Sequence, residues 1–202
     1  MLSAINQRHL SMLRDISEVS SLCGTQTYIW GGLAPDVLSG RFLREHDDVD
    51  GFTLNMWALE DQLTALYQQK GYAVSIVKEV HFLRVEYGEA RAVFNQLEID
   101  GETAMWRHAG NEGTVYFPQR WLSPTPHRFY DASVFTSGVE FEYCIKTRPQ
   151  LLNPEWKGRE KEVAALHWLE GALDDKQIDR LAIQKRIWSH NPYWVRRGYP
   201  SG

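Results

Sequence analysis

The sequence has few of the features that mark secreted, membrane-spanning or nucleic-acid-coating proteins. Its two cysteines, Cys23 and Cys144, each fall in an apolar helical pattern, which favours buried free thiols in a reducing compartment over a disulfide. No apolar run approaches the roughly 20 residues that cross a bilayer, and the first residues lack the pattern of a secretion signal. The net charge is −4, and the scattered Lys and Arg residues do not indicate a surface that coats DNA or RNA. We therefore expect a cytoplasmic protein.

Internal repeats and low-complexity tracts are also missing, so the 202 residues are available for an ordinary hydrophobic core. Pro124-Thr125-Pro126 predicts a stiff, extended linker. We accordingly expect a core in residues 1–123 and a helical region, packed on that core, in residues 124–202. The sequence does not indicate an oligomeric state.

Apolar spacing predicts helices and strands that alternate irregularly along the chain. Period-3.6 patterns predict helices, and alternating patterns predict strands. Within the first helix His9 has polar neighbours and is expected to be solvated. The overall prediction is an α+β fold, with a mixed or antiparallel sheet packed by helices. The expected helices are 3–22, 57–69, 139–146, 160–173 and 176–189, and the expected strands are 72–77, 81–87, 91–99 and 114–117.

The stretch 28–54 predicts a strand, a glycine turn, a short helix and a second strand. The turn contains Gly31 and Gly32, and paired glycines let backbone N–H groups approach an anion closely. Pro35 suits the first turn of a helix, and Gly40 suits a left-handed cap at its end. This arrangement is typical of a phosphate-binding turn.

Two carboxylates follow at alternating positions. Asp48 and Asp50 point to the same side of a strand, and like charges this close are unfavourable unless a cation lies between them. Hard oxygen ligands without cysteine favour Mg²⁺, which commonly binds one or two carboxylates together with substrate phosphates. The alternative is a solvated acidic turn made by Asp47, Asp48 and Asp50.

A specific resemblance rests on ten residues of this stretch: Trp30, Gly31, Gly32, Ala34, Asp36, Gly40, Arg44, His46, Asp48 and Asp50. Their spacing resembles that of the small antibiotic nucleotidyltransferases, the lincosamide and aminoglycoside adenylyltransferases of the polymerase-β-like superfamily. The segments 95–101, 113–117 and 121–123 are similar to the middle of that family. The resemblance covers residues 28–170.

The resemblance implies a reaction and a set of roles. The chain would move a nucleoside monophosphate, AMP from ATP, onto a hydroxyl of a small molecule such as an antibiotic. Asp48 and Asp50 would act in catalysis and hold Mg²⁺, and Gly31 and Gly32 would cradle the phosphates. The acceptor would bind at the segment 106–121 and the later helices.

Other residues have less specific roles in this interpretation. Arg44 and His46 either brace the acidic strand or touch phosphate, and Asp36 would orient the start of the helix. For Lys146 and Lys161 two readings stay open, nucleotide binding and a solvated helix face. Arg159 has the same two readings, and the aromatic residues Trp106, Tyr116 and Trp121 suit either an acceptor or the core.

The sequence departs from the family pattern at Arg91. Relatives place a third carboxylate on the strand that contains this residue, where it binds metal or accepts the proton of the attacking hydroxyl. An arginine can do neither, and we expect Arg91 to pair with Asp48 or Asp50. Glu89, or less simply Glu98, could supply the carboxylate instead. The alternative is a degenerate nucleotidyltransferase fold that binds a nucleotide or a partner without turnover.

Overall fold

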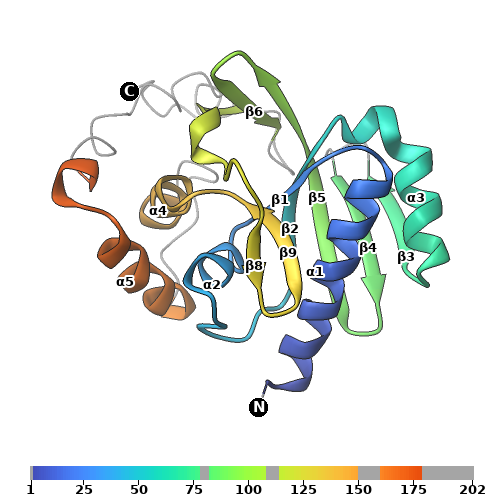
Figure 1. Cartoon of the computed structure of the whole chain (residues 1–202), viewed down its shortest axis with the longest axis horizontal. Helices are drawn as coiled ribbons and strands as arrows, with labels where there is room; N and C mark the ends of the chain where they lie inside the picture. The colour runs from blue at the N-terminus through green and yellow to red at the C-terminus, as the bar shows by residue number, and fades with distance from the viewer. Residues whose placement is uncertain (1, 78–81, 108–113, 150–159, 179–202) are drawn as a thin grey trace.

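A mixed β-sheet with helices on both faces organises the chain. The computed structural model describes residues 2–77, 82–107, 114–149 and 160–178 (Figure 1). These residues form an α+β fold, as predicted, and their sheet has nine strands. The strands are β1 (Thr27–Trp30), β2 (Val49–Leu54), β3 (Ala73–Val77), β4 (Phe82–Tyr87), β5 (Ala90–Asp100), β6 (Thr103–Arg107), β7 (Thr114–Pro118), β8 (His127–Phe129) and β9 (Ala132–Thr136).

The strand order brings the glycine turn and the acidic strand to the middle of the sheet. The order is β3-β4-β5-β2-β1-β9-β8, with the β6–β7 hairpin paired to the second half of β5. The strand β2 runs antiparallel to β1 but parallel to β5, and β1 runs parallel to β9. The expected strands 72–77, 81–87 and 91–99 form an antiparallel meander, β3-β4-β5, and β5 lies parallel to β2 because the chain crosses over between these two strands.

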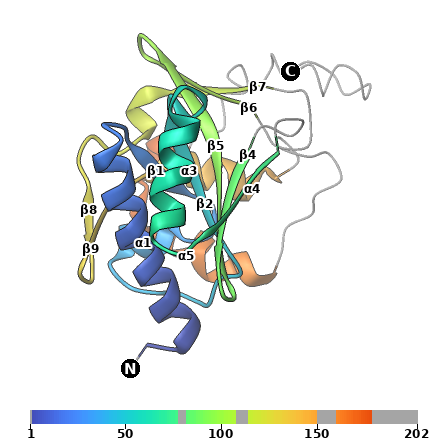
Figure 2. The same cartoon turned by 90° about the vertical axis from the view of Figure 1, so that its right-hand side faces the viewer.

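The helices cover the two faces of the sheet unequally. Figure 2 shows α1 and α3 side by side on one face and α4 and α5 behind the sheet. We refer to these as the α1 face and the α4 face. The helical elements are α1 (Ala4–Leu22), α2 (Ala34–Ser39), η1 (Met56–Leu59), α3 (Glu60–Gln69), η3 (Gln119–Trp121), α4 (Val139–Thr147), η5 (Glu160–Glu162) and α5 (Val163–Ala172).

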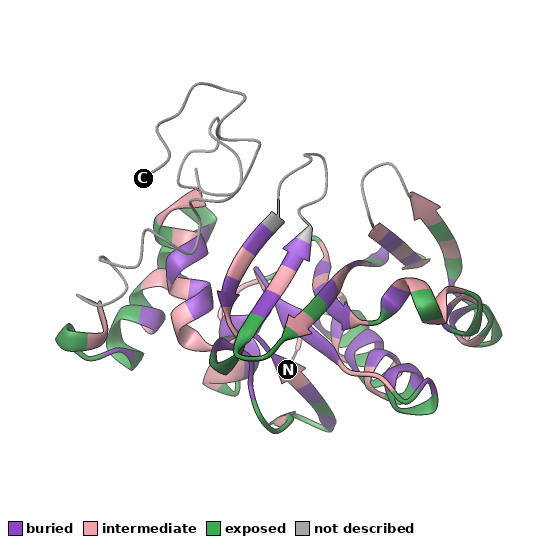
Figure 3. Ribbon diagram, turned by 90° about the horizontal axis from the view of Figure 1, so that it is seen from above, coloured by how far each residue is buried: buried purple, intermediate pink, exposed green. Residues whose placement is uncertain are grey.

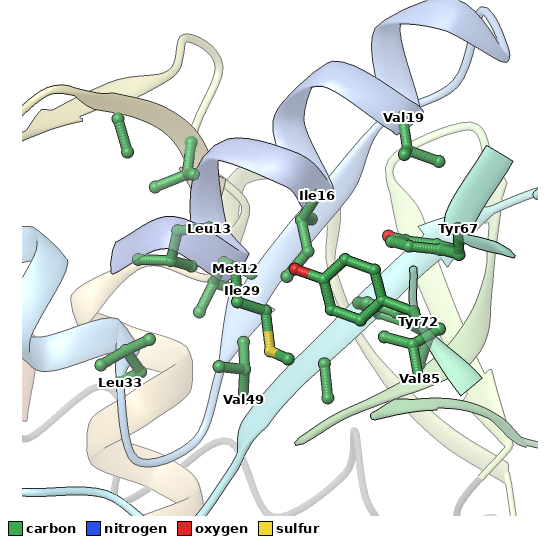
Figure 4. Close-up of a cluster of buried hydrophobic side chains, with 14 of the residues drawn as sticks. Met12, Leu13, Ile16, Val19, Ile29, Leu33, Val49, Tyr67, Tyr72 and Val85 are labelled. Carbon is green, nitrogen blue, oxygen red and sulfur yellow. The ribbon is translucent and has the colours of Figure 1, made fainter. Parts of the chain in front are cut away.

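The core on the α1 face follows the helical spacing of the first helix. Side chains three or four residues apart on α1 pack onto β1, β2 and β4 and onto two tyrosines, one on α3 and one just after it (Figure 4). The residues labelled there include Met12, Leu13, Ile16, Val19, Ile29, Val49, Tyr67, Tyr72 and Val85.

The core on the α4 face is rich in aromatic side chains. The rings of Trp30 and Phe52 stack with their centroids 4.8 Å apart, and Phe141 of α4 meets Phe52 edge-on at 5.6 Å. Neighbouring residues on a strand enter opposite cores, as Ile29 and Trp30 do. Figure 3 shows the central strands mainly buried and the outer helices with exposed faces.

Several local predictions are confirmed and others are corrected. The short helix α2 has its proline in the first turn, and Gly40 follows in the left-handed conformation with φ 75°. Both cysteines are free and buried. The sequence did not predict β6, β8 or β9, and β9 pairs with β1 inside the main sheet, so the sheet continues beyond residue 123. Most of the expected helix 176–189 lies outside the described residues.

The part of the chain that the structure describes contains no helix long and apolar enough to cross a membrane. The division into a core and a packed helical region remains a proposal, with α4 as the first helix after the sheet.

Candidate active site

The glycine turn joins the end of β1 to α2 at the centre of the sheet. Gly31 has φ 75°, and a Cβ added there would lie 2.8 Å from Oδ2 of Asp50. A Cβ on Gly32 would lie 2.9 Å from Nδ1 of His46 and 3.0 Å from Nη2 of Arg44. Glycine is required at Gly31 by its left-handed backbone and at both positions by this close approach. The turn therefore lies against three other residues of the predicted site, Asp50, His46 and Arg44.

The two aspartates lie on the α4 face of the acidic strand. Val49 is buried in the core of the α1 face, so its neighbours Asp48 and Asp50 face the other way. Asp48 immediately precedes β2, and Asp50 is aligned with Val93 of β5. The register places Asp50 on the α4 face, and Asp48 contacts Arg91 of β5; the convergence of the two carboxylates stays a prediction.

Arg91 pairs with Asp48, as its position in the sequence led us to expect. Its Nη2 lies 3.1 Å from Oδ2 of Asp48, and the side chains are 48% and 37% exposed. The residues of β5 that enter the core of the α1 face are Ala90, Ala92 and Phe94. The residues that alternate with them, Arg91, Val93 and Asn95, therefore lie on the α4 face. The site-facing stretch of β5 beside the aspartates therefore has no acidic residue.

Neither proposed replacement carboxylate joins the aspartates. Glu89 pairs with Arg8, and its side chain is 80% exposed. Glu98 accepts a hydrogen bond from Gln96, whose own side-chain oxygen accepts from the backbone of Trp57 on the α1 face. Glu89 and Glu98 are thus engaged elsewhere. Within the described ranges no group of three or more His, Cys, Asp or Glu side chains is arranged to hold a metal ion.

Asp36 and His46 form a buried pair that fastens the link between α2 and β2. Nε2 of His46 lies 2.7 Å from Oδ2 of Asp36, and the side chains are 2% and 1% exposed. The same oxygen accepts from the backbone N–H of Leu43 at 3.1 Å. His46 and Asp36 therefore hold the link that leads into the acidic strand.

Two cations that were expected to bind phosphate form ion pairs with buried carboxylates. Lys146 of α4 lies 2.8 Å from Glu162 and 3.7 Å from Glu142, and Arg44 lies 3.4 Å from Glu162. The four side chains are at most 16% exposed. Their charges balance, because two cations face two carboxylates. A nucleotide that uses Lys146 or Arg44 must therefore compete with Glu162.

Glu142 is a site residue that the sequence analysis missed. It is fully buried, and its Oε1 accepts hydrogen bonds from the backbone N–H of Gly31 at 2.8 Å and from the hydroxyl of Ser137 at 2.6 Å. Burial raises the pKa of this carboxyl, and Lys146, Ser137 and Gly31 oppose the rise. One N–H of the glycine turn is thus already occupied. In the sequence, the i, i+4 spacing of Glu142 and Lys146 on one helix could have indicated that these two side chains interact.

Lys161 contacts the acidic stretch from another element. Its Nζ lies 2.7 Å from Oδ2 of Asp47, with side chains 41% and 71% exposed. The hydrogen bond and charge of Lys161 lower the pKa of Asp47. Lys161 is therefore near the aspartates, although it is bound to Asp47 rather than to Asp48 or Asp50. Arg159 lies outside the described residues.

Comparison with known proteins decides the family. Residues 12–130, more than half of the 202, match the family model described as aminoglycoside-2''-adenylyltransferase. The chain belongs to the aminoglycoside-2''-adenylyltransferase family. The suspected membership in the antibiotic nucleotidyltransferases is confirmed, and the family reaction is nucleotidyl transfer to an antibiotic. No curated relative matches the sequence.

Solved structures support the same fold at low sequence identity. The solution structure of ANT(2'')-Ia, an antibiotic-resistance factor, is 17% identical with a TM-score of 0.67, over 89% of this chain and 93% of that one. The structure of ANT(2'')-Ia in complex with adenylyl-2''-tobramycin is 16% identical with a TM-score of 0.66, over 88% of this chain and 96% of that one. The structure of the lincosamide adenylyltransferase LnuA bound to lincomycin is 14% identical with a TM-score of 0.59, over 78% of this chain and 94% of that one.

In this adenylyltransferase-family chain the tryptophans expected at the acceptor site are core residues. Trp106 and Trp121 are each 1% exposed and belong to the core on the α4 face. Tyr116 is aligned with Met105 on the β6–β7 hairpin, one position away from Trp106, so it faces the opposite side. Core packing is the correct interpretation for both tryptophans. The rings of Trp106 and Trp121 are therefore not exposed for stacking on an acceptor.

The expectation of a solvated His9 was wrong. This residue has no exposed surface, and its ring lies edge-on to His46 with the centroids 6.5 Å apart. Neither ring nitrogen has a hydrogen-bond partner among the described residues. Burial, with a smaller contribution from His46, lowers the pKa of His9. Polar neighbours in sequence misled the prediction, because His9 lies on the buried face of α1 with Met12 and Leu13.

A groove of about 690 Å³ lies between the link after α2 and helix α5. Phe42 and Trp168 give it an aromatic lining, and Arg41 and His167 add polar groups. The aspartates and the glycine turn do not line it.

Proposed function

We propose that the chain is a Mg²⁺-dependent nucleotidyltransferase that moves AMP from ATP onto a hydroxyl of an aminoglycoside or lincosamide antibiotic in the cytoplasm. The observation that carries the proposal is the placement of Asp48 and Asp50 on one face beside the Gly31-Gly32 turn, in a chain of the adenylyltransferase family. The two free thiols suit a reducing compartment.

The donor set fits one Mg²⁺. This ion takes oxygen ligands in octahedral geometry and commonly uses one or two carboxylates, several waters and substrate phosphates. Asp48 is 37% exposed, and Oδ2 of Asp50 closely approaches the glycine turn where the phosphates would lie. Both carboxylates can therefore reach an ion held between the strand and the triphosphate. The bound ion would neutralise phosphate charge during transfer.

The chain's own residues would position the reactants. Arg44 lies against the glycine turn at Gly32, where no side chain separates its guanidinium from a phosphate bound at the turn, and it would bind the phosphate oxygens. The acceptor oxygen would bond to the α-phosphorus while the bond from that phosphorus to the bridging oxygen of pyrophosphate breaks. The hydroxyl proton would pass to water, since β5 presents no carboxylate beside Asp50. In-line positioning and charge neutralisation supply most of the rate in such transfers.

The second candidate is a degenerate fold that binds nucleotide without turnover. The ion pair between Arg91 and Asp48 favours it, because the guanidinium supplies the positive charge that a metal would bring. The comparisons with known proteins do not favour it.

Thermal unfolding with ATP, with and without Mg²⁺, separates the two candidates. A nucleotide at 100 times its Kd stabilises the folded chain by about 2.7 kcal/mol. We expect this stabilisation to require Mg²⁺ and to vanish in Asp48→Asn. Arg14→Gln, which breaks an exposed ion pair with Asp131 away from the aspartates, is the control. Metal-independent stabilisation that survives in Asp48→Asn would contradict the enzyme. Pyrophosphate release with aminoglycoside and lincosamide acceptors then identifies the substrate.

A further inference from the structure

Arg91 lies between two acids, Asp48 just before β2 and Glu86 on β4. On one side its guanidinium contacts Asp48 at 3.1 Å. On the other side Glu86 of β4 is its aligned partner across the antiparallel β4–β5 pair. Leu83 and Val85 enter the core of the α1 face, so Glu86 shares the α4 face with Arg91. The three residues form a row of alternating charge across the sheet.

The other cations near the aspartates are already paired with different acids. Lys146 and Arg44 contact Glu162, and Lys161 contacts Asp47. Arg91 is thus a cation that an ion pair joins to the predicted metal ligand Asp48.

An inference about the metal centre follows, and it rests on the proposed function. Many phosphoryl-transfer and nucleotidyl-transfer centres use two divalent cations about 3.5–4 Å apart. We propose that Arg91 takes the place of one of them: its guanidinium is a permanent second positive charge, and the centre binds one divalent cation instead of two. The guanidinium stays protonated at any ordinary pH, so this charge is always present.

Ligand number and charge both support a single ion. Two divalent cations need carboxylates beyond Asp48 and Asp50, and the adjacent positions of β5 hold Arg91 and Val93 instead. A fixed guanidinium also repels a second ion nearby. When Asp48 turns to a bound metal, Glu86 gives Arg91 another acidic partner. Arg91 thereby stays beside the reacting phosphates without blocking the metal.

Counting bound Mn²⁺ tests the inference. Mn²⁺ is titrated into the full-length chain with a non-hydrolysable ATP analogue, and free Mn²⁺ is followed by electron paramagnetic resonance. We expect one Mn²⁺ per wild-type chain. In Arg91→Asp the centre gains a carboxylate and loses the guanidinium, and we expect two.

Three further variants measure the competition for Asp48. Arg91→Gln should still bind one Mn²⁺, but up to about five-fold more tightly, the range that an exposed ion pair allows. Glu86→Gln should bind it up to about five-fold more weakly, because Arg91 loses its alternative partner. Arg14→Gln is the matched control, since Arg14 is 48% exposed, as Arg91 is, and pairs with Asp131 at 2.7 Å. Its Mn²⁺ affinity should equal that of the wild type.

The outcomes are distinguishable. Two Mn²⁺ per wild-type chain, or Mn²⁺ affinities in Arg91→Gln and Glu86→Gln equal to that of Arg14→Gln, would overturn the role of Arg91 and leave the proposed function standing. Absence of Mn²⁺ binding in the wild type and all variants would overturn the proposed function itself. The Arg91→Gln measurement decides the matter even where Arg91→Asp fails to fold.

Discussion

Glu142 offers a sharp test of how the glycine turn is held, because replacing it by Gln or by Ala should have very different effects. In Glu142→Ala the buried N–H of Gly31 loses its acceptor, and Ser137 keeps only a weaker contact at 3.3 Å to a backbone carbonyl. A buried donor left without a partner costs about 1–3 kcal/mol, and the emptied volume adds to that. We expect Glu142→Ala to lower the free energy of unfolding by about 2–4 kcal/mol.

Glu142→Gln keeps an oxygen for both donors and removes only the buried charge. Lys146 retains Glu162 at 2.8 Å, so no cation is left alone. Oε2 of Glu142 has no hydrogen-bond partner among the described residues, so an amide in place of the carboxylate breaks no hydrogen bond there. We expect a change within about 1 kcal/mol at neutral pH.

The raised pKa of Glu142 predicts how the stability difference between Glu142→Gln and the wild type changes with pH. The folded-state pKa of Glu142 is raised above its ordinary value of 4.5, so the folded state binds the proton more tightly than the unfolded state does. This stabilising contribution is complete below pH 4.5 and is lost as pH rises through the folded-state pKa. The Gln variant lacks that loss, so its stability relative to the wild type should improve as pH rises.

Urea unfolding of the wild type, Glu142→Gln and Glu142→Ala between pH 5 and pH 8 measures these differences. Glu140→Gln, on the first turn of the same helix, is the control for a changed charge on α4. A Gln variant as unstable as the Ala variant, or a difference between Gln and wild type that does not change with pH, would refute the reasoning.

Three further predictions use other sites. In urea unfolding, Gly31→Ala should lower the free energy of unfolding by about 2 kcal/mol or more, and Gly40→Ala by about 1 kcal/mol. Both residues have φ 75°, but only at Gly31 would the added methyl group meet neighbouring atoms. Equal losses of stability in the two variants would contradict this. His9→Leu should reduce the loss of stability below pH 6.5, because the lowered pKa of His9 means that the folded state resists its protonation; an unchanged pH profile would contradict it. Lys161→Ala should raise the pKa of Asp47, measured by NMR titration, so that stability is lost at a less acidic pH as pH falls; an unmoved pKa would argue against the pair in solution.

Local patterns in the sequence predicted the parts of the fold that depend on neighbouring residues. The 3.6-residue period placed α1, and Pro35 and Gly40 marked the start and end of α2. The alternation around Val49 predicted that Asp50 lies on the face opposite to Val49, and the register of β2 agrees. These features follow from local backbone geometry, which spacing alone reveals.

The missed features depend on residues that are far apart in the chain. Glu142 and Gly31 are separated by 111 positions, and nothing near Glu142 indicates that its carboxylate reaches a turn in another element. His9 was misjudged for the same reason, since its burial is set by the packing of α1 onto the sheet. The short strand β8, of three residues, gives too little alternation to be recognised, and it is paired with β9, a strand that follows it in the chain.

The buried ions that join α4, η5 and the link after α2 tie the late part of the chain to the early part. A chain shortened to its first 149 residues would keep Lys146 and Arg44 but lose Glu162, the carboxylate that contacts both. Truncation would thus leave two cations without that neutralising partner near the centre of the molecule. We expect the N-terminal half to depend on the C-terminal helices for its folding, so that neither can be expressed as an independent unit.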